Sequence, residues 1–197
     1  MPSRAKDLTC IIQSRECQRL DWPVHKRDCP SRQEERVGRS VSEMSRFDEL
    51  NHFVGKHVPA ITRAAGLALD LGHDMSSSYT SVFFVLLHSR PSLHIEHRFY
   101  AIKAEVVPFE VFGESCTKER HKNQVAMAKE RQGEDSAGVF FVVVHTVDQP
   151  QIMATMPINV STKVLHQMQH AAKYKPDPVR RIWRNWLLRM LNNGILV

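Results

Sequence analysis

The sequence predicts an α+β domain in which an antiparallel or mixed sheet of about four strands packs against flanking helices. Three observations indicate this fold class. Residues 82–87 and 139–144 are apolar runs rich in Val and Phe, as expected of central strands buried on both faces. Residues 47–71 place apolar side chains largely at helical spacing, and a further helical stretch follows Pro178 near the end of the chain.

Each element has its own local signals. Pro59 interrupts the first helical stretch, which predicts either two helices or one kinked helix, and Gly72 ends it. The charged segment 114–133 is expected to form a solvent-exposed helix or a mobile insertion. The four predicted strands cover residues 80–88, 95–107, 139–147 and 152–160. Two closing helices are predicted at residues 161–173 and 177–193.

Composition narrows the class of protein. The chain has 197 residues, of which 42% are hydrophobic and 24% charged, as in soluble globular proteins. Its longest apolar runs are far shorter than the roughly 20 residues of a membrane span, so no membrane partner is expected. With four cysteines and no secretory signal at the start, the expected location is intracellular, in the cytoplasm or the nucleus.

The net charge of +6 raises the question of nucleic-acid binding. Acidic and basic residues are interspersed in the first forty positions and in residues 114–135, and no nucleic-acid-binding motif is present, so no specific nucleic-acid partner is expected. The densest basic stretch, residues 173–189, interleaves arginines with Trp183 and Trp186. It could bind phosphates or an acidic partner, but the spacing favours an amphipathic helix that packs its apolar side on the core.

The segment that carries the most chemical information lies near the N-terminus. It runs Cys17-Gln18-Arg19-Leu20-Asp21-Trp22-Pro23-Val24-His25-Lys26, and Cys29 follows. Asp21 and Pro23 are typical of the start of a helix, and residues four apart on a helix share one face. His25 and Cys29 can therefore point at one ion. Thiolate sulfur and imidazole nitrogen are ligands that zinc prefers.

This segment resembles the C-terminal half of a MYND-type zinc finger, whose closing signature runs Cys-Gln, Trp, His and Cys. The matching residues are Cys17, Gln18, Trp22, His25 and Cys29, preceded by the commonly found Ser14-Arg15-Glu16. MYND fingers bind two zinc ions through seven cysteines and one histidine, and many take short proline-containing peptides. The resemblance therefore implies zinc as cofactor and a peptide or protein as partner, with Trp22 packing the module or lining a peptide groove.

The ligand set departs from the family pattern. The fifth ligand falls at Gln13, the third and fourth fall near Arg4 and Asp7, and the first two would precede Met1. In the family's interleaved arrangement Cys17 belongs to one ion, and His25 and Cys29 belong to the other. Cys10 offers a fourth donor, although the spacing of the four residues matches no established zinc pattern. Cys-X-X-Cys pairs upstream of Met1 would make Cys17, His25 and Cys29 ligands of two plausible zinc sites.

These features suggest a domain organisation and a function. We expect a partial MYND-type finger at residues 1–30, a linker at 31–45 and an α+β domain at 46–197. Ala64, Ala65, Ala68 and Leu69, with Asn192 and Gly194, resemble the region after the finger in uncharacterised fungal MYND-finger proteins. The expected function is non-enzymatic zinc binding and protein interaction. A second hypothesis is a structural interaction domain that carries a degenerate finger.

The α+β domain offers two further histidine pairs. His88 and His145 end the two apolar strands and would be neighbours if those strands pair, which suggests an enzyme site as the alternative function. His166 and His170 stand four apart on a predicted helix, like the metal ligands of zinc proteases. The general-base position of those enzymes is Gln167 here, and an amide cannot take a proton from water.

Overall fold

The computed structural model describes residues 41–92, 94–112, 114–174 and 177–197. The chain divides into two compact units, Met1–Met44 and Ser45–Val197. Only the last four residues of the first unit are described, as the start of a helix. The fold given below is that of Ser45–Val197.

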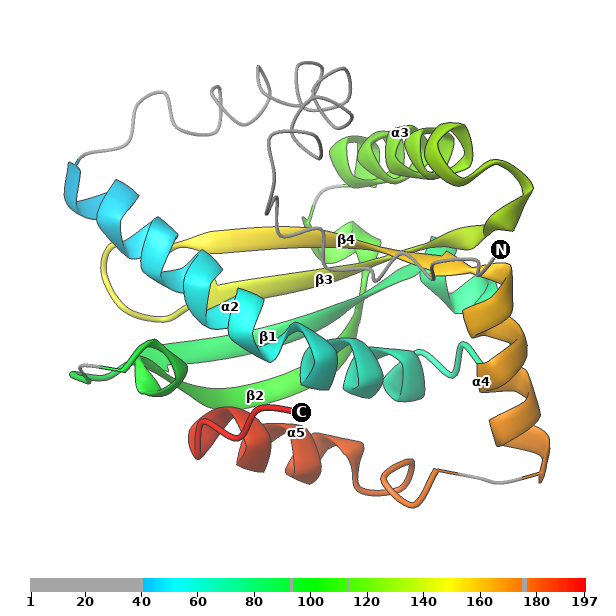
Figure 1. The fold of residues 1–197 in the computed structure, drawn as a ribbon. Helices are drawn as coiled ribbons and strands as arrows, with labels where there is room; N and C mark the ends of the chain where they lie inside the picture. The colour runs from blue at the N-terminus through cyan, green and yellow to red at the C-terminus, as the bar shows by residue number, and fades with distance from the viewer. Residues whose placement is uncertain (1–40, 93, 113, 175–176) are drawn as a thin grey trace, which may run out of the picture. The chain divides into compact units, whose positions relative to one another are not determined.

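The centre of this unit is a four-stranded mixed sheet with the order β2-β1-β3-β4 (Figure 1). The strands are β1 (Ser81–Ser89), β2 (Phe99–Pro108), β3 (Ser136–Thr146) and β4 (Met153–Ser161). β1 and β3 run parallel, and each pairs with its outer neighbour antiparallel. The α+β prediction with an antiparallel or mixed sheet is therefore confirmed in its mixed form.

The two apolar runs are the two central strands. Along β3, seven consecutive residues from Gly138 to Val144 are buried, which requires cover on both faces of the sheet. Phe140 and Val142 belong to the main core, while Phe141 and Val143 belong to a smaller cluster on the opposite face. The side chains alternate between the faces as the pleat of a strand requires.

The main core lies between one face of the sheet and two helices, α2 (Val41–Ala68) and α5 (Trp183–Asn192). α2 is one helix of 28 residues with Pro59 inside it, and Figure 1 shows its axis changing direction partway along. Proline has no backbone N–H to donate to the carbonyl four residues earlier, so a bend at this point is expected. Of the two predicted alternatives, the structure shows the single kinked helix.

α4 (Thr162–Tyr174) approaches the end of α2 closely, and two glycines permit this contact. A Cβ added at Gly66 would lie 2.7 Å from Met168 Cε, and one at Gly72 would lie 2.9 Å from the Met168 carbonyl oxygen. The second obstacle is backbone and cannot move aside. Gly72 therefore does more than end the helical stretch, because it also makes room for α4.

The opposite face of the sheet is covered in part by α3 (Glu114–Gln132) and by the 3-10 turns η1 (Met75–Tyr79) and η3 (Phe109–Phe112). The cluster on this face consists of buried Val82, Phe109, Phe141 and Val143, with Phe84, Val107 and Phe112 packed beside them. Among the side chains of α3 that the structure describes, only His121 and Ala128 are buried. The charged segment is thus a helix, and its described side chains are mostly exposed or half-buried.

Both edges of the sheet are protected against the addition of another strand. On β2, the Asn192 amide bonds the backbone of Ala101 at both its N–H (2.6 Å) and its carbonyl (3.1 Å). Arg184 donates to the Ala104 carbonyl of the same strand at 2.9 Å. On β4, Pro157 stands inside the edge strand, where proline removes a backbone donor.

Most predicted elements appear within a few residues of their expected positions. Residues 95–97 form the 3-10 turn η2 (Ile95–His97) instead of the start of β2, and α5 begins at Trp183, well after the predicted start at Asp177. The first helix begins at Val41, earlier than the apolar pattern indicated. Within the described residues, none of the helices has the length and hydropathy needed to cross a membrane.

Candidate functional site

The metal ligands predicted from sequence, Cys10, Cys17, His25 and Cys29, lie outside the described residues, and so does Trp22. The donor set itself fits zinc, since it combines thiolate sulfur with imidazole nitrogen. In the part of the chain that the structure describes, no group of three or more His, Cys, Asp or Glu residues is arranged to hold a metal ion. The prediction of a zinc site therefore continues to rest on the sequence of residues 10–29.

The second predicted pair, His88 and His145, does come from neighbouring strands. β1 pairs with β3 in a register that sets Leu86 opposite His145, so His88 lies two residues farther along on the same face. His145 stacks on Phe84 with ring centroids 6.4 Å apart. His88 Nδ1 instead lies 2.6 Å from the Ser89 carbonyl oxygen and 3.2 Å from the Asp148 carboxylate Oδ1.

Asp148 is the centre of a small polar cluster at this end of the sheet. Its Oδ2 accepts hydrogen bonds from the backbone N–H of Ser89 at 2.5 Å and from the Ser89 hydroxyl at 2.6 Å. Arg46 of α2 lies 3.7 Å from the same oxygen and donates to the Gln149 carbonyl at 2.8 Å. The cluster thus joins the end of β1, the connection after β3 and the beginning of α2.

The carboxylate stays ionised in this setting. Burial alone would raise the pKa of Asp148, but the hydrogen bonds from Ser89 and the charges of His88 and Arg46 outweigh it and hold the pKa below its ordinary value of 3.8. The Asp148 side chain is 17% exposed, whereas that of His88 is 58% exposed. The arrangement is an exposed imidazole beside a fixed carboxylate.

Such a pair can orient a histidine as a general base, because a carboxylate beside one ring nitrogen leaves the other for a substrate. It is not a nucleophile triad. The Ser89 hydroxyl bonds to Asp148 and also accepts from Arg46, and neither bond is to the imidazole. The same bonds also serve a structural purpose, since they fasten the connection between β3 and β4 to the end of β1.

Sequence analysis missed Asp148, Ser89 and Arg46. Asp148 comes directly after a buried strand, a position at which polar side chains commonly gather into sites. Ser89 directly follows His88, so both residues carried a usable signal. Arg46 carried none, because its place beside Asp148 depends on how α2 crosses the sheet.

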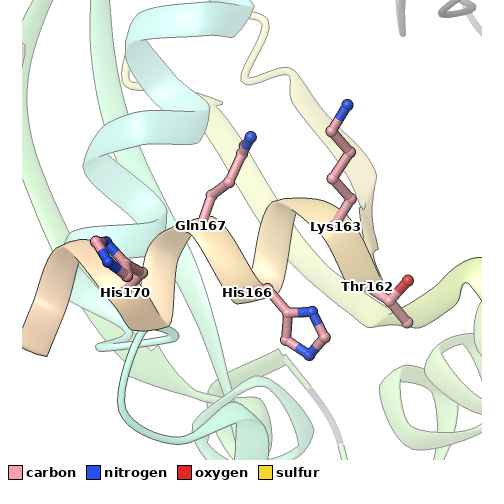
Figure 2. Close-up of a pocket in the computed structure, with 5 residues that line it drawn as sticks. All are labelled: Thr162, Lys163, His166, Gln167 and His170. Atoms are coloured by element: carbon pink, nitrogen blue, oxygen red, sulfur yellow. The ribbon is translucent and has the colours of Figure 1, made fainter.

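A separate hollow of about 610 Å³ runs along the exposed side of α4 and is lined by Thr162, Lys163, His166, Gln167 and His170 (Figure 2). His166 and His170 are both exposed. Figure 2 shows the His166 ring below the helix and the His170 ring near the helix at its other end, so the rings do not converge. His170 instead packs against Tyr174, with ring centroids 4.9 Å apart.

The α4 hollow therefore offers little catalytic chemistry. Gln167 lies beside the two histidines, where a zinc protease would need a carboxylate as base. Lys163 adds a positive charge to the same lining, which disfavours the approach of a cation. The two histidines stand on one helix as the sequence predicted, but their rings are not arranged as a metal chelate.

Comparison with known proteins does not extend this account. No protein-family model matches the chain, and neither a curated protein nor a solved structure matches it.

Proposed function

We propose that this protein is a zinc-binding protein of the MYND-finger type whose N-terminal segment is a protein-interaction module. The observation that carries the proposal is the run Cys17-Gln18, Trp22, His25 and Cys29, with Cys10 as a further donor. Zinc would be held by these thiolates and the imidazole. The partner would be a proline-containing peptide, with Trp22 as the aromatic side chain that packs the module or lines the groove.

The α+β domain is consistent with a role in interaction. On the sheet face that carries His88 and His145, Tyr100 and Met153 are 48% and 47% exposed. The register places both on that face, because Tyr100 pairs with His88 and Met153 pairs with His145. Both side chains lie on edge strands of the sheet, where a binding partner can reach them.

Peptide binding tests the proposal. The full chain, purified without chelator, should bind an immobilised proline-containing peptide more tightly than a peptide in which alanine replaces each proline. A chelator should abolish the difference, because a short segment without its metal cannot hold a groove. Replacing Trp22 by Ala should weaken binding by roughly tenfold or more, as expected for an aromatic residue at the centre of an interface.

Trp183 provides a matched control, because it packs against Phe83 in the core of the α+β domain, with ring centroids 5.5 Å apart. Trp183→Phe should leave peptide affinity unchanged. Equal binding of both peptides by the zinc-loaded chain would refute the interaction proposal, whatever the zinc content.

A second candidate function is favoured by one observation, the His88–Asp148 pair. An enzyme site here would use the exposed imidazole as a general base that Asp148 orients. If screening finds a hydrolytic or proton-transfer activity, His88→Gln should reduce it by about a hundredfold or more without changing the unfolding midpoint. Activity that survives the substitution would place the reaction elsewhere.

A further inference from the structure

The buried side of α3 depends on a histidine. His121 is 5% exposed and lies in a socket of three aromatic rings, those of Tyr79, Phe109 and Phe141, with ring centroids 5.2, 5.7 and 5.5 Å from its own. Its Nε2 lies 3.2 Å from the Val139 carbonyl on β3. The socket residues come from η1, η3 and β3, so this one side chain joins α3 to three other elements.

The other described side chains of α3 add little buried apolar surface. Among the described side chains of α3, only His121 and Ala128 are buried, and Val125 between them is half-buried. These three residues follow the spacing of one helix face, but the stripe contains only one large aliphatic side chain. α5 is different, since it buries Leu187, Met190 and Leu191 in the main core. Among the described side chains of α3, His121 therefore makes the most extensive buried contact with the sheet.

We propose that His121 is a pH-sensitive latch that holds α3 over one face of the sheet and releases it in mild acid. When His121 is neutral, Nε2–H donates to the Val139 carbonyl and the ring packs among the aromatic side chains. When it is protonated, a charge is placed in a socket built from apolar rings. Opening of α3 lets the charged imidazole reach water, and it uncovers Phe109, Phe141 and their neighbours.

The electrostatic surroundings do not offset this penalty. Burial lowers the pKa of His121 from its ordinary value of 6.5, and the Val139 carbonyl opposes this only in part. The other titratable groups on the packed elements are Tyr79 on η1, Glu110 on η3 and His145 near the end of β3, together with the charged residues of α3 itself. Within the described residues, no charged neighbour contributes to the shift in the pKa of His121.

The sign of the pH dependence follows from the lowered pKa. The open state has the ordinary pKa of 6.5, so it binds more protons than the closed state below that pH. The contribution of His121 to the stability of the closed state is therefore fully present above pH 6.5. It decreases as the pH falls from 6.5 towards the lower pKa of the closed form. At pH 5 the opening equilibrium should rise by up to about thirtyfold, the factor by which a free histidine is protonated there.

Hydrogen exchange of the full chain, corrected for the intrinsic effect of pH, tests the latch residue by residue. In the wild type, protection of the α3 amides should fall between pH 7 and pH 5, by up to about 25-fold. His121→Gln retains a side-chain donor but does not titrate, so its α3 protection should not change with pH. His166→Gln on α4 is the matched control, since His166 is exposed, and it should behave like the wild type.

A second buried histidine must be distinguished from His121. His57 on α2 packs against Phe53 and contacts the Glu96 carbonyl at 3.3 Å, and burial lowers its pKa as well. Its protonation would loosen the main core and not α3. A pH response confined to α2 and η2 would therefore refute the latch. Increased α3 protection at pH 5 would also refute it, because the aromatic rings would then stabilise the imidazolium by cation–π contact.

Discussion

At the scale of single residues, Asn192 shows how one side chain can complete a sheet. Its amide oxygen and nitrogen bond the N–H and the carbonyl of Ala101, the two groups that a neighbouring strand would otherwise pair. The predicted helix at residues 177–193 ends directly before Gly194, whose φ of +61° is typical of the residue after a helix. The pairing with β2 had no sequence signal, because it depends on where α5 docks.

Replacing Asn192 by Ala should lower the free energy of unfolding by about 1–3 kcal/mol, because it leaves two backbone groups of β2 without partners. Asn193→Ala is the matched control. Asn193 is exposed, and its side chain bonds the Arg189 carbonyl within its own helix, so its loss should change stability by about 0.5 kcal/mol or less. Urea denaturation of the three proteins measures both values, and equal stability of the two variants would contradict this role of Asn192.

At the scale of elements, patterns of apolar residues predicted whether each segment is a helix or a strand. They predicted less well which other elements it contacts. The runs in β1 and β3 were recognisable because strands buried on both faces need continuous Val and Phe. The start of α5 was predicted too early, because Asp177 and Pro178 resemble a helix N-terminus. In the structure Asp177 caps a turn instead, accepting from Val179 N at 2.8 Å, and it pairs with Arg63 of α2 at 2.8 Å.

The contacts of α3 are the clearest example of a feature that the apolar pattern did not predict. Its sequence, with few apolar residues, allowed either an exposed helix or a mobile insertion. Its buried aromatic contact is made by a histidine, His121, which an apolar pattern does not count, and whose socket is assembled from three separate segments. The latch proposed for His121 belongs to this scale, since the titration of one side chain governs the attachment of a whole helix.

At the scale of the whole molecule, the sequence predicted the α+β class but left the sheet topology open. The parallel pairing of β1 and β3 brings His88 and His145 onto one face, as pairing of the two apolar strands would require. Asp148, which pairs with His88, was not predicted, because its contact is made across the connection between β3 and β4. The finger segment differs from Asp148 in this respect. Its possible metal ligands can be recognised in the sequence, but the segment lies outside the described residues.

The central claim is that the thiols and the imidazole of residues 10–29 bind zinc, and zinc content measures this most directly. We expect elemental analysis of the full chain, purified without chelator, to give about one zinc per chain, as four donors suffice for one tetrahedral ion. The double variant Cys17→Ser, Cys29→Ser should lose the metal, whereas the matched double variant His166→Gln, His170→Gln should retain it. A wild-type chain that stays free of zinc when the metal is supplied in excess would contradict the account.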